Sequence, residues 1–341
     1  MNEWDRIPAT SPAAIFTLRD SSFAADLFFA AAGHFDFFNR LRETPADFNT
    51  ICRTFGLQPR PADVLLTLLK SYRLIREEKG IFHVTGTAHD YLTKTSFFDL
   101  TSYVNSLKER PVCLEMVKVL KTGQPANWAS SKSGGQWAAS MEEATFAEAF
   151  TAGMNSRGAY LAAGLIPKLD LSPFHAVLDI GGASGIYAAV MMKHFPHLKG
   201  GIFEKPPVDK IASYSMAKFG LEKKADVFAG DMFTDRLPEG YDVHFLSHVL
   251  HDWDMDNVQT ILTNSYESLA PGGMLVLHDA HINRRKTGPR AVAEYSVLLM
   301  FSTEGKCYSV NEMEEVLNKT GFSTVTWTPT VMNRSIITAR K

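Results

Sequence analysis

The sequence is poor in cysteine, in unbalanced charge and in long apolar runs. Its 341 residues include three cysteines, Cys52, Cys113 and Cys307, which are widely spaced and form no CxxC pair. A disulfide framework or a cysteine-ligated zinc site is therefore not expected. The 35 basic and 37 acidic residues leave a formal charge of −2. That balance offers no electrostatic basis for binding nucleic acid or an anionic membrane.

Targeting and membrane signals are also missing. The first twelve residues, MNEWDRIPATSP, contain neither the basic stretch nor the apolar stretch of a secretory signal. No apolar run reaches the roughly 18 residues that a spanning helix needs. We therefore expect a cytoplasmic protein with no membrane partner. The length suits a small domain followed by a larger one.

Residues 1–105 have the pattern of a small helical domain. Apolar residues recur at helical spacing in 11–38, and further helices are expected within 44–57 and 60–75. A strand–turn–strand pattern follows in 76–85, which completes the order of a winged helix. The helix within 60–75 is rich in Val and Leu and lacks the polar side chains that a major-groove reader needs. We therefore expect a winged-helix-like dimerisation domain that binds no nucleic acid.

The pattern changes twice after this domain. Residues 106–165 have helical composition, interrupted within 121–140 by a Gly/Ser-rich stretch between Trp128 and Trp137. We expect a helical linker or a substrate lid there. From 166 to 341 strands and helices alternate, and the strand cores are nearly continuous apolar runs. This pattern predicts a doubly wound α/β domain whose ligand lies at the carboxyl ends of its strands.

Three successive strand ends carry residues suited to a nucleotide-like cofactor. The first strand ends in LDIGGASG, in which residue 183 is alanine, so the dinucleotide pattern G-x-G-x-x-G is not matched and a nicotinamide dehydrogenase is disfavoured. The second strand ends in Glu204, a suitable acceptor for ribose hydroxyls. The third ends in Asp231, followed by two apolar side chains that suit the face of an adenine.

The motifs LDIGGASG, GIFEKP, GDMF and HDW resemble those of class I S-adenosylmethionine-dependent O-methyltransferases. The resemblance is closest to the plant caffeate and acetylserotonin enzymes and their bacterial counterparts, and it covers nearly the whole chain. It implies a Rossmann-like methyltransferase domain, a homodimer, and methyl transfer to a hydroxyl of a small, aromatic or polyketide-like acceptor. The implied cofactor residues are Asp179, Gly181, Gly182, Gly185, Glu204, Asp231, Met232, Phe233, Ser247, Trp253 and Arg157, and the implied substrate residues are Met154, Met300 and Trp128.

The same resemblance implies the acid–base residues. His251 falls at the position of the family's catalytic base, and Asp279 at that of the acid that supports it, although the plant enzymes have Glu there. Two further positions depart from the plant pattern. Ser247 stands in place of a lysine, and Cys307 stands in place of a second acid. Glu304 precedes Cys307 by three residues and can replace that acid only if the loop turns differently.

Other interpretations of the segment LSHVLHDWD stay open at this stage. His248 and His251 suggest a metal site, but a strand would place them on opposite faces. We therefore expect no metal and interpret His248 as a structural histidine. Alternative functions are N- or C-methylation, a non-methylating relative, and a winged-helix regulator that senses a ligand. The regulator predicts salt-sensitive DNA binding without turnover.

Overall fold

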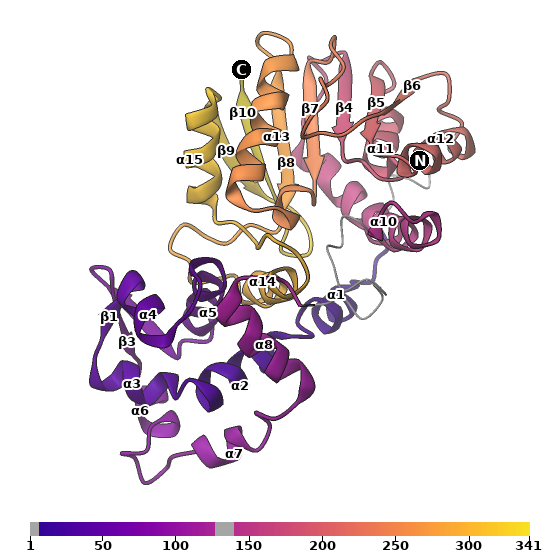
Figure 1. Cartoon of the computed structure of the whole chain (residues 1–341). Coiled ribbons are helices and arrows are strands. Elements are labelled where there is room, and N and C mark those ends of the chain that lie inside the picture. Colours follow the sequence, from indigo (N-terminus) through magenta and orange to yellow (C-terminus); the bar gives the residue numbers. More distant parts are fainter. Residues whose placement is uncertain (1–6, 127–139) are drawn as a thin grey trace. The chain divides into compact units, whose positions relative to one another are not determined.

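The computed structural model describes residues 7–126 and 140–341 (Figure 1). Contacts divide the chain into unit 1, residues 1–12, 131–281 and 310–341, and unit 2, residues 13–130 and 282–309. This division differs from the predicted boundaries at 105 and 165. The reason is packing: α8 (Pro111–Thr122) packs on α2 (Ala24–His34) within unit 2, whereas α10 (Ala144–Leu165) packs on α11 (Ile186–His194) within unit 1.

Unit 2 contains helices around a three-stranded antiparallel sheet in the order β1-β3-β2. The predicted helices and hairpin are present, and the short strand β1 adds a third strand that the sequence pattern did not indicate. An Asp47 side chain that accepts from the Thr50 N–H begins α4, and Gly56 at φ 64° ends it. The remaining elements are α1 (Ala13–Asp20), α3 (Phe37–Glu43), β1 (Ala46–Asp47), α4 (Phe48–Phe55), α5 (Pro59–Ser71), β2 (Ile75–Glu78), β3 (Ile81–Val84), α6 (Gly86–Leu92), α7 (Thr101–Asn105) and α14 (Arg290–Ser302).

Helix α5 is the centre of unit 2. It packs against α14, which returns to this unit from much later in the chain. At the start of α5, the Arg60 guanidinium donates hydrogen bonds to four carbonyl oxygens, those of Gly123, Met300, Thr303 and Gly305. One side chain therefore satisfies carbonyl groups at the ends of α8 and α14.

Unit 1 is built on a seven-stranded sheet in the order β6-β5-β4-β7-β8-β10-β9. The first five strands in this order are parallel, and β10 runs antiparallel to both β8 and β9. The strands are β4 (Ala176–Ile180), β5 (Lys199–Glu204), β6 (Ala225–Ala229), β7 (Val243–Ser247), β8 (Met274–Asp279), β9 (Ser323–Pro329) and β10 (Ser335–Arg340). Every residue of β8 is buried, as the continuous apolar pattern predicted.

Helices cover this sheet in two groups (Figure 1). Helices α10, α11 and α12 (Val208–Lys218) pack together, as do α13 (Met255–Ser268) and α15 (Val310–Thr320). Within its described residues, unit 1 also contains two short 3-10 helices, η2 (Ile166–Lys168) and η3 (Leu250–Asp252). Strand order reverses at β4, so the predicted doubly wound α/β fold places a ligand at the carboxyl ends of β4 and its neighbours. Among the described residues, no helix is both long and apolar enough to cross a membrane.

Candidate active site

The glycine turn after β4 brings backbone, rather than side chains, to the carboxyl edge of the sheet. Gly181 has φ 67°, and a Cβ added there would lie 2.9 Å from Val249 Cγ2. A Cβ on Gly182 would lie 2.6 Å from Asp179 Cγ. Ala183 also takes a left-handed φ of 52°, a conformation that costs a non-glycine residue roughly 1–2 kcal/mol. The turn is therefore left-handed at both Gly181 and Ala183, although residue 183 is alanine and not the glycine of the dinucleotide pattern.

The buried carboxyl group of Asp179 and the partly buried one of Glu204 lie beside this turn. Glu204 accepts hydrogen bonds from the N–H groups of Ala183 (2.7 Å) and Lys205 (3.0 Å). Burial raises the pKa of Glu204 to about 7. Burial, followed by the charge of Glu204, raises the pKa of Asp179 to about 8. Asp179 Oδ2 is buried and has no hydrogen-bond partner in the part of the chain that the structure describes. It is therefore suited to a hydrogen-bonding group supplied by a ligand.

An apolar wall and a carboxylate follow β6 at the same edge. The Phe233 and Trp253 rings meet edge to face, with centroids 4.7 Å apart. Asp231 Oδ1 accepts from the Phe233 N–H, and Asn264 Nδ2 donates to the Met232 carbonyl oxygen at 2.9 Å. These bonds fix the turn that carries Met232. The predicted combination of an acid with apolar side chains is thus assembled in space.

The residues present fit an adenosyl cofactor. Acids stand at the ends of β4, β5 and β6, the glycine turn lies between the first two, and Asp179 retains an unused oxygen. Helix α10 is tied to this edge because the Ser184 hydroxyl donates to Asn155 Oδ1 at 2.8 Å. Asn155 was missed by sequence reasoning, although it lies two residues before Arg157 in the motif MNSRG.

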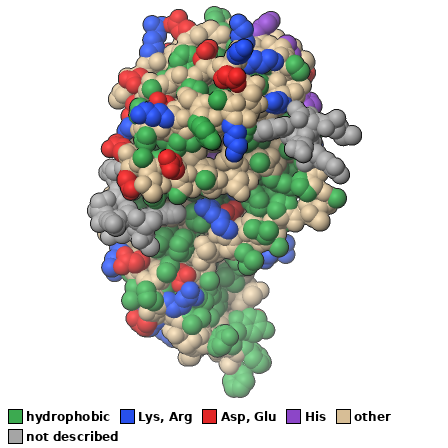
Figure 2. Space-filling model, turned by 90° about the vertical axis from the view of Figure 1, so that its right-hand side faces the viewer, with side chains coloured by type: hydrophobic (Ala, Val, Ile, Leu, Met, Phe, Trp, Pro, Cys, Tyr) green, Lys and Arg blue, Asp and Glu red, His purple; other side chains and the backbone are tan. Residues whose placement is uncertain are grey.

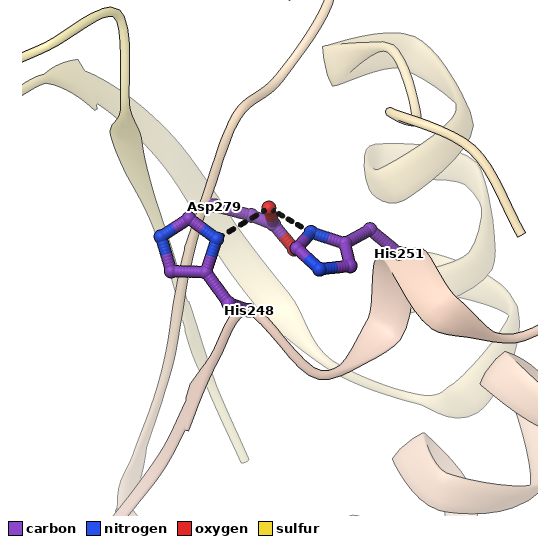
Figure 3. Close-up of side chains that lie close together, drawn as sticks. All are labelled: His248, His251 and Asp279. Carbon is purple, nitrogen blue, oxygen red and sulfur yellow. Dashed lines mark hydrogen bonds and ion pairs between the residues drawn. The ribbon is translucent and has the colours of Figure 1, made fainter. Parts of the chain in front are cut away.

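His251 and Asp279 form a buried hydrogen-bonded pair (Figure 3). Asp279 ends β8, and His251 lies on η3 after β7. The distance from His251 Nδ1 to Asp279 Oδ1 is 2.6 Å, and the two side chains are 5% and 11% exposed. Burial alone would raise the pKa of Asp279, but the charge and hydrogen bond of His251 hold that pKa well below its usual range. Asp279 is therefore an anionic acceptor, and His251 directs Nδ1–H toward it.

The prediction that His248 and His251 lie on opposite faces of a strand is wrong. Strand β7 ends at Ser247, and His248 takes a left-handed φ of 57° that turns the chain into η3. Both histidines consequently approach the same carboxylate, with His248 Nδ1 3.4 Å from Asp279 Oδ1 (Figure 3). The apolar residues Val249 and Leu250 lie beyond the end of β7, so the apolar pattern alone extends a strand past His248.

This convergence reopens the question of a metal ion. One ligand atom each from His248, His251 and Asp279 lies within 4.8 Å of the other two. The 2.6 Å His251–Asp279 distance is shorter than the about 3.3 Å that separates two ligands of a tetrahedral ion. Burial, with help from the charges of Arg157 and Arg334, lowers the pKa of His248 well below its usual range. The same charges oppose a metal cation, so the arrangement suits a hydrogen-bonded base better.

Two further residues lie at this edge for different reasons. Ser247 ends β7, and its hydroxyl lies 2.9 Å from His278 Nδ1. Burial lowers the pKa of His278 to about 3, so this histidine is neutral.

Arg334, which is 4% exposed, directly precedes Ser335, and Ser335 pairs with Asp279 in the sheet. No sequence signal marked Arg334, because the register of an antiparallel strand is not visible in its own residues.

The predicted substrate residues are not brought together in one unit. Met154 is partly exposed on α10 of unit 1, whereas Met300 is buried on α14 of unit 2. Trp128 and Trp137 lie outside the described residues. Cys307 belongs to unit 2, and its N–H donates to the Ser296 hydroxyl at 3.1 Å. The roles of Cys307 and Glu304 stay predictions.

Comparison with known proteins identifies the family. The family described as "O-methyltransferase domain" matches residues 115–323, more than half of the chain. The chain belongs to the O-methyltransferase family. This O-methyltransferase is 28% identical to 3-hydroxy-5-methyl-1-naphthoate 3-O-methyltransferase of Streptomyces sahachiroi over 84% of its own length and 83% of that protein. It is 31% identical to the chicken (Gallus gallus) acetylserotonin O-methyltransferase over 52% of its own length and 50% of that enzyme.

Solved structures agree with the fold. An O-methyltransferase family 2 protein from Planctomyces limnophilus, solved with apigenin, superimposes with a TM-score of 0.88 at 28% identity, covering 100% of this chain and 99% of that one. Human N-acetylserotonin methyltransferase, solved with S-adenosylmethionine, gives a TM-score of 0.61 at 23% identity, covering 98% and 99%. The latter likeness concerns the fold alone. The predicted family, α/β fold class and enzyme class are therefore confirmed.

Proposed function

We propose that this O-methyltransferase transfers a methyl group from S-adenosylmethionine to a hydroxyl of a small aromatic or polyketide-like molecule, with His251 as general base. The observation that carries the proposal is the 2.6 Å hydrogen bond between His251 and Asp279. It lies at the carboxyl edge of the sheet, beside the residues that fit the cofactor. Histidine paired with a buried carboxylate is a common arrangement for a base.

Relatives support this class of acceptor. The naphthoate enzyme is named for methylation of a hydroxyl on an aromatic acid. A second relative, 25% identical over 86% of this chain, is named the tetracenomycin polyketide synthesis 8-O-methyl transferase TcmO of Streptomyces glaucescens. The Planctomyces structure contains apigenin, a polyphenol. All three names point to hydroxylated aromatic rings.

The buried pair sets the proton chemistry. Because Asp279 is anionic and accepts from Nδ1–H, the lone pair of His251 is on Nε2. The Nε2 atom therefore takes the proton of the acceptor hydroxyl, and Asp279 stabilises the resulting imidazolium. Asp252 Oδ1, 3.7 Å from His251 Nε2, adds a second negative charge near that atom. His251 is only 4% exposed, so bulk water has little access to it.

The energetic requirement on the base is moderate. A phenol titrates near 10 and an imidazole near 6.5, a gap of about 3.5 units or about 5 kcal/mol for complete prior proton transfer. The ion pair with Asp279 reduces this cost, and proton transfer concerted with methyl transfer avoids the full cost. Alignment of the acceptor oxygen with the methyl group lowers the remaining barrier to methyl transfer.

Residues at the sheet edge hold the cofactor in this proposal. S-adenosylmethionine, when bound, supplies a methyl group activated by its positive sulfonium. Glu204 accepts from the ribose hydroxyls, Asp231 from the adenine amino group, and Gly181 lets the backbone approach the methionine portion. Arg157 on α10 binds the carboxylate. The buried Asp179 Oδ2 accepts from a donor of the same ligand.

Unit 2 supports a homodimer built on a winged-helix-like domain. Its helices α4 and α5, followed by the hairpin β2–β3 of a small antiparallel sheet, support the winged-helix-like assignment. Hydrophobic side chains gather at the lower end of the face shown in Figure 2, where Figure 1 has α7. Large apolar side chains exposed in and around α7 and α8 are Phe97, Phe98, Leu100, Tyr103, Leu107 and Leu114. A patch of this kind marks a protein interface.

The redox state of the cysteines bears on the compartment. None of the three cysteines, all of which lie among the described residues, is in a disulfide. This supports a reducing compartment such as the cytoplasm.

Carbon methylation is the second candidate function. One relative, 32% identical over 48% of this chain, is named the L-tyrosine C(3)-methyltransferase of Streptomyces lavendulae. A base beside an aromatic hydroxyl activates the ring carbon next to it as well as the oxygen.

The hypothesis of a DNA-binding regulator is disfavoured. Nine of the thirteen residues of α5, which would be its recognition helix, are buried.

Calorimetry and turnover together test the proposal. Wild type is expected to bind S-adenosylhomocysteine and to transfer labelled methyl groups to apigenin or 3-hydroxy-1-naphthoate. His251→Ala is expected to keep the cofactor affinity and lose at least about a hundredfold in turnover, in line with a general base. His175→Ala serves as control, since the His175 side chain is 89% exposed. Absence of binding refutes the cofactor, and undiminished turnover of His251→Ala refutes the base. Mass spectrometry of the product separates O- from C-methylation.

A further inference from the structure

His248 has an unusual backbone and an unusual side-chain environment. Its φ of 57° places it in the left-handed region, which only a few per cent of non-glycine residues adopt. Its N–H still donates to the His278 carbonyl oxygen at 3.0 Å, so the strained turn is held by the end of β8. The side chain is 2% exposed. Non-glycine residues held in the left-handed region cluster at active sites and ligand clamps.

The group at which His248 is aimed is the carboxylate that holds the proposed base. Asp279 Oδ1 accepts from His251 Nδ1 at 2.6 Å and from the Ala280 N–H at 2.7 Å. His248 Nδ1 lies 3.4 Å from the same oxygen, and the two imidazole rings approach it from either side (Figure 3). At 3.4 Å this is a long contact, and neither ring nitrogen of His248 makes a hydrogen bond to the described residues. Asp279 Oδ1 is thus the acceptor that His248 Nδ1 faces.

The protonation of His248 follows from its surroundings. Burial lowers its pKa well below the usual range, and the charges of Arg157, Arg334, His251 and His278 act in the same direction. The ring is therefore neutral and carries one N–H. If Nδ1 were unprotonated, a nitrogen lone pair would face an anionic oxygen at 3.4 Å. Nδ1–H is the favourable tautomer because it places a donor there instead.

We infer that His248 is a positioning residue: its neutral Nδ1–H shares the Asp279 carboxylate oxygen with His251 and limits how strongly the carboxylate holds the base. The inference rests on the proposed role of His251 and gives His248 more than the structural role that its sequence context predicts. An N–H dipole at 3.4 Å from the oxygen stabilises its negative charge electrostatically without a full hydrogen bond. Less of that charge then acts on the His251 Nδ1–H.

The other groups around the two rings come from several elements. His251 faces Asp279 and His281 from β8 and the residues after it, and Asp252 from η3. His248 faces Arg157 from α10, Arg334 before β10, and His278 from β8. These groups are unchanged by substitution of His248. A change in the titration of His251 in such a variant therefore reports the loss of the donor at Asp279.

Nuclear magnetic resonance of the full-length protein labelled with 15N-histidine tests the inference without turnover. Two variants are compared with wild type. His248→Phe removes the donor, whereas His248→Asn places an amide nitrogen at the position of Nδ1 and tolerates a left-handed φ. His248→Phe is expected to move the midpoint of the His251 imidazole titration upward by about half a unit, the effect of one weak neutral donor. His248→Asn is expected to restore the wild-type midpoint.

Controls separate this role from a purely structural one. His244 is a fully buried histidine on β7 that bonds to the Ser265 hydroxyl at 2.9 Å. His244→Asn is expected to lower stability without moving the midpoint of His251. Equal midpoints in wild type and His248→Phe, or equal shifts in the Phe and Asn variants, overturn the inference. If His248→Phe does not fold, the 15N shifts of wild-type His248 decide: an Nε2–H tautomer overturns it. Failure of methyl transfer leaves these readouts intact and counts only against the proposed function.

Discussion

Asp279→Asn is the substitution with the most direct consequence for the proposed chemistry. It replaces an anionic acceptor at 2.6 Å from His251 Nδ1 with a neutral amide of nearly the same shape. A hydrogen bond to a charged group contributes about 1.5–3 kcal/mol. Since each 1.36 kcal/mol changes a rate tenfold, kcat/KM is expected to fall by roughly 10- to 150-fold. The amide also presents an NH2 group that favours the wrong histidine tautomer, which places the loss toward the upper end.

Initial rates with labelled cofactor, measured from pH 6 to 9 with apigenin as acceptor, check this expectation. Affinity for S-adenosylhomocysteine is measured in parallel and is expected to change less than threefold. Asp254→Asn is the matched control, because Asp254 is an exposed helix cap on α13 and asparagine caps a helix nearly as well. A kcat/KM for Asp279→Asn within threefold of wild type would refute the role of the carboxylate.

The same substitution has a stability signature. The folded-state pKa of Asp279 lies below its unfolded value, so the hydrogen bond that its carboxylate accepts from His251 contributes stability at neutral pH. That contribution is present above the ordinary value of about 3.9 and is lost as pH falls through the folded pKa. Asp279→Asn is therefore expected to be less stable than wild type at pH 7, with the difference shrinking below about pH 4. Urea denaturation of wild type and Asp279→Asn, at pH 7 and again below about pH 4, measures this difference in the free energy of unfolding.

Three further outcomes are expected. The pKa of Asp179 is raised to about 8 by burial and by Glu204, so its contribution to stability is complete below about pH 4 and is lost as pH rises to about 8. Thermal unfolding of the ligand-free protein should therefore show a fall in Tm between about pH 5 and 8 that is smaller in Asp179→Asn. An equally large fall in both proteins contradicts this. Arg60→Ala leaves four carbonyl groups without their donor and should lower the free energy of unfolding by about 2–4 kcal/mol in urea titrations, with Arg60→Lys intermediate. Phe97→Asp combined with Tyr103→Asp places charge in the exposed apolar patch and should convert the dimer to monomer in light scattering; an unchanged mass argues for another interface.

Much of unit 1 was predictable from sequence because its central strands are buried on both faces. The run MLVLHD of β8 follows two glycines, and the run AVLDI of β4 is followed by two glycines, so local residues indicate where these strands begin or end. The ends of successive parallel strands necessarily meet at one edge. For this reason the sequence alone suffices to place Glu204 and Asp231 at the same edge of the sheet as the glycine turn.

The features of the site that the sequence did not predict share a physical cause. Each depends on contacts between residues that are far apart in the sequence. β7 ends where its last residue, Ser247, pairs with His278, yet apolar residues continue to Leu250. The left-handed turn at His248 then brings two histidines to one carboxylate, a result that strand periodicity cannot indicate. Arg334 reaches the site through the pairing of Ser335 with Asp279. That register is set by the sheet as a whole.

The return of residues 282–309 to unit 2 has a consequence for how the protein is made. Helix α5 is packed by α14, which is synthesised more than 200 residues after it. During translation the first 130 residues therefore emerge without the helix that covers α5, and their apolar surface stays open until residue 309 has left the ribosome. A fragment ending at residue 130 would carry the same exposed surface permanently. Unit 2 thus depends on completion of most of the chain, and a truncation that removes the catalytic unit would also remove part of the fold of its neighbour.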